Sequence, residues 1–141
     1  MSKTVYVAAL SQVPTYEETQ TTTNLSTSTI ASFFTHNAGS GSAKWAMSNG
    51  STGTIKLVPG NIGIDSTTAS VTLTAATNLT NVRLSCSYTT ETNYDKVTIT
   101  AAGTTVASAV SGSGTKSWTG NMTKGQTIVL TYVKDVSQSA S

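Results

Sequence analysis

Apolar and polar residues alternate along three segments in the second half of the chain. The apolar positions are Val82, Leu84, Cys86 and Tyr88 in the first segment, Val97, Ile99 and Ala101 in the second, and Ile128, Leu130 and Tyr132 in the third. A period of two marks half-buried antiparallel strands, with one face in a core and the other in water. The pattern therefore predicts functional groups on loops or on exposed sheet faces.

The first half of the chain carries shorter strand signals separated by polar stretches. Residues 4–10 (TVYVAAL) read as an isolated strand, and residues 15–29 have no apolar period and read as a polar arm. Asn49-Gly50 is a hairpin signal between two short apolar runs. No segment has a sustained helical period, and about eight strands in this rhythm predict a sandwich or a jelly roll.

Composition supports a single folded β domain. The chain has 141 residues, of which 37% are hydrophobic and only 10% charged. Serine and threonine together make up about a third of the chain, and threonine favours strands while serine favours turns. A net charge of +2 with scattered basic residues argues against nucleic acid as a partner.

The residues that most often carry chemistry give little sign of an enzyme. Cys86 lies in phase with an apolar face, where a free cysteine acts as a small hydrophobe. His36 stands in the segment THNAGSGS, with no nucleophile motif to form a hydrolase triad. The Gly-Ser runs at 39–42 and 111–114 lack the lysine of a phosphate loop and read as hairpin tips or loops. We expect an exposed loop histidine and no catalytic site.

The N-terminal residues predict no export and no membrane anchor. The apolar run in MSKTVYVAALSQ is too short for a signal peptide, and no stretch approaches the length of a membrane span. We expect synthesis in a host cytoplasm, no membrane partner and no cofactor.

Four segments in order carry a resemblance to a known class of module. They are GNIG at 60–63, SYTTETNYDKVTI at 87–99, SGSGTKSW at 111–118 and LTYVKDVSQSAS at 130–141. This order resembles a jelly-roll module related to the MAM and CUB sandwiches, which recur in bacterial surface proteins and bacteriophage virion proteins. The resemblance runs from about Ser32 to the end, and Tyr94-Asp95 is its most specific element.

The resemblance implies a last strand that the sequence does not show in its usual place. Such modules usually continue past the KD-S-S element into another acidic position and a final strand, whereas this sequence ends at Ser141. Either the strand is lacking or residues 4–10 fill its position, from the same chain or from a neighbour. We therefore divide the chain into residues 1–27, an N-terminal strand and arm for assembly, and residues 28–141, the β-sandwich. The predicted assembly residues are Thr4, Val5, Tyr6, Val7 and Leu10.

A calcium site is a further implication of the resemblance, because loop acids of CUB-like modules can hold the ion. The matching residues are Glu91, Asp95 and Asp135, with Ser137 and backbone carbonyls as further oxygen donors. The alternative is that Asp95 caps a turn and Glu91 is solvated.

Aromatic residues raise the possibility of a sugar-binding platform, since aromatic rings both stack on sugars and fill cores. Tyr88 and Tyr132 share faces with core residues, so they are predicted to be core. Trp118 lies in a polar segment and is the candidate for glycan contact.

Two functions remain from these observations. The leading one is a non-enzymatic structural protein of a bacteriophage particle, a capsid decoration (cement) protein or a small tail or fibre component. Its partners would be the major capsid or tail protein and other copies of itself, and the arm would dock on a symmetric lattice with avidity. The alternative is a carbohydrate-binding adhesin module that recognises a host glycan.

Overall fold

The computed structural model describes most of the sandwich and the backbone of the N-terminal strand. The described residues are 5–14 (backbone only), 27, 30–39, 44–49, 55–61, 66–90 and 93–134. Within them the strands are β1 (Val5–Pro14), β2 (Phe34–Asn37), β3 (Ala46–Asn49), β4 (Ile55–Val58), β5 (Thr67–Ala75), β6 (Leu79–Thr89), β7 (Lys96–Ala101), β8 (Thr104–Val110), β9 (Ser113–Met122) and β10 (Thr127–Lys134). A 3-10 helix, η1 (Ile30–Ser32), precedes β2.

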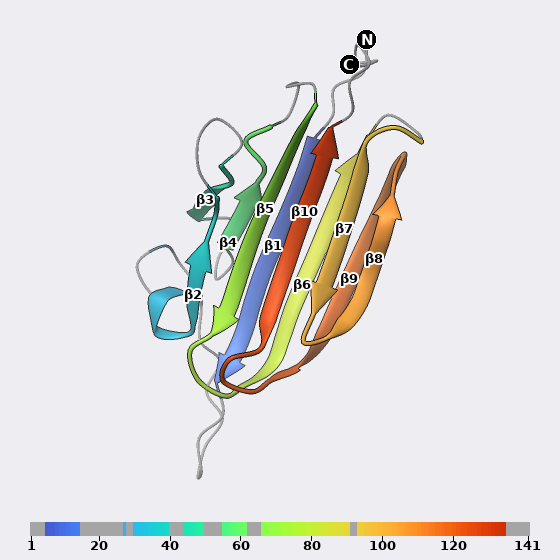
Figure 1. Ribbon diagram of the computed structural model, residues 1–141. Coiled ribbons are helices and arrows are strands. Elements are labelled where there is room, and N and C mark those ends of the chain that lie inside the picture. The colour runs from blue at the N-terminus through green and yellow to red at the C-terminus, as the bar shows by residue number, and fades with distance from the viewer. Residues whose placement is uncertain are drawn as a thin grey trace.

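The strands form two five-stranded antiparallel sheets that pack face to face (Figure 1). The β1 sheet has the order β3-β4-β1-β6-β9, and the β10 sheet has the order β2-β5-β10-β7-β8. The prediction of an all-β antiparallel sandwich is confirmed. Among the described strands, β2 and β3 each end a sheet, so in this part of the chain both sheets are open along these edges.

One hydrophobic core fills the space between the sheets. Alternate residues of β6 are buried, among them Leu84 at 1% exposure, and they meet alternate residues of β5 such as Leu73. Burying one such side chain contributes about 1.5–3 kcal/mol. The apolar positions predicted from the alternation are all buried: Val82, Leu84, Cys86, Tyr88, Val97, Ile99, Ala101, Ile128, Leu130 and Tyr132.

Short-range predictions succeed where the turn chemistry is local. The hairpin at Asn49-Gly50 is confirmed, since β3 and β4 pair antiparallel with Asn49 opposite Ile55. The loop between them has more than two residues. The predicted N-terminal strand is present but extends to Pro14. By contrast, residues 111–112 do not close a hairpin, because they join β8 in one sheet to β9 in the other.

Two β-bulges interrupt the regular ladders at residues with positive φ. Asn81 (φ 53°) lies where the register of β6 shifts against β1 and β9, and its amide donates to Asn121 Oδ1 at 3.2 Å. Ala109 (φ 49°) lies where β8 shifts against β7, and its amide donates to Thr98 Oγ1 at 3.1 Å. A side-chain oxygen thus replaces the ladder partner that each bulge removes.

Candidate functional site

The N-terminal strand lies inside the β1 sheet rather than beside it. Its backbone pairs with β6 from Val5 opposite Thr89 to Pro14 opposite Leu79, and with β4 at Ala8, Ala9 and Leu10. The predicted assembly residues Val5, Tyr6, Val7 and Leu10 therefore have their backbone in a central strand, and Thr4 lies outside the described residues. Residues 5–14 therefore share a sheet with β3, β4, β6 and β9 of the region 28–141.

The pairing of the later strands is nested around the β7–β8 hairpin. β7 pairs with β8, β6 with β9, and β5 with β10. One step further out, the partner of β4 would be a strand that follows β10 along the chain. β1 occupies that position, between β4 and β6, although it comes from the other end of the sequence.

The start of β1 and the end of β10 lie at the same end of the sandwich. Val5 is opposite Thr89, the last residue of β6, and Val133 is opposite Lys96, the first residue of β7. The connection from β6 to β7 spans only residues 90–95, so the start of β1 and the end of β10 lie close together. β1 is therefore placed as if it continued from β10.

A buried polar cluster lies at this same end, on the residues that the resemblance marks. Asp95 and Lys134 both have fully buried side chains, and Lys134 Nζ lies 3.6 Å from Asp95 Oδ1. The Tyr132 hydroxyl donates to Asp95 Oδ2 at 3.5 Å. Asn61, from the GNIG segment, donates to the carbonyl oxygens of Tyr132 and Thr67, both at 3.1 Å. The cluster ties the connection before β7 and the turn before β5 to the end of β10.

Of the three predicted calcium ligands, the structure describes Asp95. Asp95 carries the ion pair just described, while Glu91 and Asp135 lie outside the described residues. Among the described residues, no three His, Cys, Asp or Glu side chains lie close enough together to hold a metal ion. The calcium site stays a prediction, and Asp95 would have to exchange its ammonium partner to take part.

Trp118, the predicted glycan contact, faces the core side of the β1 sheet. It lies directly opposite the buried Leu84, is half-buried, and packs against the core. Its ring covers Gly120, where an added Cβ would lie 2.5 Å from Trp118 Cζ2. This placement favours the packing role over an exposed platform, and Tyr88 and Tyr132 are core as predicted.

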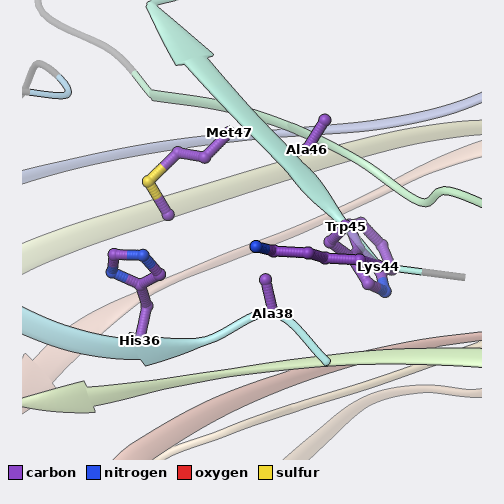
Figure 2. A pocket seen from close by; sticks show the side chains of 6 residues that line it. All are labelled: His36, Ala38, Lys44, Trp45, Ala46 and Met47. Atoms are coloured by element: carbon purple, nitrogen blue, oxygen red, sulfur yellow. The ribbon is translucent and has the colours of Figure 1, made fainter. Parts of the chain in front are cut away.

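His36 lies on the edge strand β2 rather than in a loop, and it lines a cleft of about 460 Å³. The edge cleft is lined by His36, Ala38, Lys44, Trp45, Ala46 and Met47. In Figure 2 the Lys44 ammonium group points toward the His36 ring, and Met47 lies over the same space. His36 and Lys44 are exposed, whereas Trp45 is 2% exposed and forms an apolar wall.

Neither Lys44 nor Lys134 was assigned a role from the sequence. The burial of Lys134 can be predicted from the sequence, because it is in phase with Ile128, Leu130 and Tyr132 on the core face of β10. A charged residue at such a position requires a buried partner. Lys44 has no comparable signal, since it lines the edge cleft together with His36 only because the edges of the two sheets lie side by side.

Two further features bear on candidate chemistry. Cys86 is buried, as its apolar phase predicts. In the part of the chain that the structure describes, no helix has the length and apolarity needed to cross a membrane.

Comparison of the chain with protein-family models, with curated proteins and with solved structures found no match.

Proposed function

We propose that this chain is a non-enzymatic structural protein of a bacteriophage particle, a capsid decoration (cement) protein or a small tail or fibre component. It docks on a symmetric lattice of a major capsid or tail protein and associates with other copies of itself. The observation that carries the proposal is the position of β1, an N-terminal strand that fills the place of a strand after β10.

The nested pairing supports the assignment as a jelly roll with its last strand taken from the N-terminus. The modules that the sequence resembles recur in virion proteins, and in this chain β1 occupies the position beside β4 that the nested pairing gives to a strand after β10. A strand position filled from a distant part of the chain is suited to exchange. The same backbone hydrogen bonds form whether β1 comes from the same copy or from a neighbour.

The covalent connection supports the same interpretation. β1 is joined to the remaining described strands only through the polar segment 15–29, which links it to η1 and β2. An arm of this kind lets each copy contact its neighbours, and repetition over a lattice gives avidity without a large interface per copy.

A circular permutant tests the role of the polar arm separately from the role of β1. A chain that starts at Ser28, runs to Ser141, continues directly into Met1 and ends at Pro14 keeps every described strand and loses residues 15–27. The joined residues 135–141 and 1–4 span up to about 35 Å, ample for neighbouring strand ends. Simple removal of residues 1–27 is a poorer test, because it also removes a central strand.

We expect the permutant to fold as a monomer and to lose assembly, both self-association and binding to phage particles or to their isolated capsid or tail lattices. Circular dichroism checks the fold, and light scattering with particle co-sedimentation checks assembly, with the unpermuted chain as the control. A folded permutant that assembles like the unpermuted chain would overturn the role of the arm. Failure of the unpermuted chain to bind any such particle would overturn the virion proposal.

The adhesin alternative is tested separately. It requires glycan binding that is lost in Trp118→Ala while the fold persists. Because Trp118 packs against the core, this variant must also be compared with the wild type by chemical denaturation.

A further inference from the structure

The edge cleft lies where both sheets are open. Among the residues that the structure describes, β2 pairs only with β5 and β3 only with β4, so within that part of the chain each strand has one edge of backbone N–H and C=O groups that its sheet does not pair. A backbone hydrogen bond from Trp45 to the Ala38 carbonyl (2.9 Å) closes one end of the space between the two strands. Unpaired strand edges accept an extended segment through main-chain hydrogen bonds.

The charge of the edge cleft selects the kind of segment. Lys44 supplies an ammonium group and His36 the ring nitrogens of an imidazole, while the remaining lining residues are uncharged. Trp45 and Met47 add apolar walls, and a carboxylate between His36 and Lys44 can accept a charge-assisted hydrogen bond from the Lys44 ammonium. The cleft therefore fits an extended segment that presents acidic side chains.

We propose that the edge cleft binds residues 15–26 of a second copy of this chain, with one carboxylate of the Glu17-Glu18 pair directed between His36 and Lys44, because adjacent side chains of an extended segment face opposite ways. Glu17 and Glu18 are the only adjacent pair among the six acidic residues of the sequence. The threonines that follow them favour an extended backbone. This inference rests on the proposed assembly function and names the surface that receives the arm.

The same copy cannot supply this pair. Leu10, Ile55 and Asn49 form one row across β1, β4 and β3, and the edge cleft lies on the side of this row away from Pro14. Strand rise and spacing place Lys44 roughly 30 Å from Pro14. Full extension carries Glu18 at most about 14 Å from Pro14, and the remaining roughly 16 Å exceeds what a glutamate and a lysine side chain span together.

Thr27, which follows residues 15–26, also lies away from the cleft. The Thr27 amide donates to Asn49 Oδ1 at 2.8 Å, at the end of β3 that is remote from Lys44. The arm of one copy in the cleft of the next is a head-to-tail arrangement that suits a lattice.

Zero-length cross-linking of the full chain tests the contact directly. Unlabelled and 15N-labelled protein are mixed, allowed to exchange, and treated with a carbodiimide, which joins a carboxylate to an amine with loss of water. We expect cross-linked peptides that join Lys44 to Glu17 or Glu18 and contain one light and one heavy partner. Lys56 and Lys124, both exposed, serve as internal controls for non-specific amines.

Peptide binding supplies the second measurement. Trp118→Phe in the full chain leaves Trp45, a wall of the edge cleft, as the single tryptophan reporter. We expect the fluorescence of Trp45 to change saturably as a synthetic peptide of residues 15–26 is added. The affinity of the peptide should fall at high salt. Glu17→Gln with Glu18→Gln in the peptide, or Lys44→Gln with His36→Gln in the protein, should weaken binding about tenfold or more. Lys124→Gln should change nothing.

The outcomes separate this inference from the proposed function. Cross-links within single copies only, or a Gln peptide that binds as well as the Glu peptide, would overturn the inference. So would Lys44→Gln with His36→Gln having no effect on peptide binding. If particles still bind the chain in those cases, the virion proposal survives and the arm docks elsewhere. If peptide binding follows the expected pattern but no particle is bound, the virion proposal fails and the self-association remains.

Discussion

Lys134 Nζ lies 3.6 Å from Asp95 Oδ1, and both side chains are fully buried. Each of these charged groups would be strongly unfavourable in the core without the other. The pair joins the end of β10 to the residue before β7, close to the start of β1. It explains in physical terms how a lysine can occupy a core position at the end of β10.

Removing one member of the pair should cost more than removing both. We expect Lys134→Met to lower the free energy of unfolding by about 3–5 kcal/mol, because the Asp95 carboxylate is left buried without its ammonium partner. Adding Asp95→Asn should recover part of this loss, since the amide still accepts from the Tyr132 hydroxyl. Urea denaturation of both single variants and the double variant measures the coupling; additive losses would show that the two groups do not interact.

β1 should be essential to the sandwich. Ala8 is paired on both sides, with Leu57 in β4 and Cys86 in β6, so proline at this position removes a ladder hydrogen bond in a central strand. We expect Ala8→Pro to destabilise the fold by about 2–4 kcal/mol. Ala8→Gly keeps the amide and should cost only about 0.5–1 kcal/mol. Equal stability of the proline variant and the wild type would place β1 outside the sheet.

Gly120 should resist even the smallest side chain. A Cβ there would lie 2.5 Å from Trp118 Cζ2, so Gly120→Ala must displace the indole ring from the core edge. We expect a loss of about 1–3 kcal/mol and a change in the near-ultraviolet circular dichroism of the tryptophans. Thr119→Ala, on the exposed face of the same strand, is the matched control and should do neither.

Ala109 should be more stable as glycine. Its φ of 49° is in the left-handed region, which glycine adopts without the steric cost that alanine bears. We expect Ala109→Gly to raise the free energy of unfolding by roughly 0.5 kcal/mol. Ala107→Gly, in the same strand but buried and without a positive φ, should have the opposite sign, with a loss of about 1 kcal/mol. Thermal unfolding of both variants tests the contrast in sign.

Much of the fold can be predicted from the sequence because the information is local. Alternation with a period of two identifies the core faces of β6, β7 and β10, and Asn49-Gly50 identifies the β3–β4 hairpin. The candidate sites were harder to predict. Trp118 lies in a polar segment and still packs toward the core, because β9 pairs with β6 in a register that sets it opposite Leu84.

The sequence by itself determined the all-β class, the buried faces, the buried Cys86 and the separation of an N-terminal strand from the later strands by a polar arm. These features depend on neighbours along the chain, where side-chain period and turn chemistry act. Only the tertiary structure decided which strands pair across long separations. It placed β1 between β4 and β6, joined Lys134 to Asp95, and brought His36 and Lys44 together across the open edge. Those choices depend on closing a common core between two sheets, which no local pattern specifies.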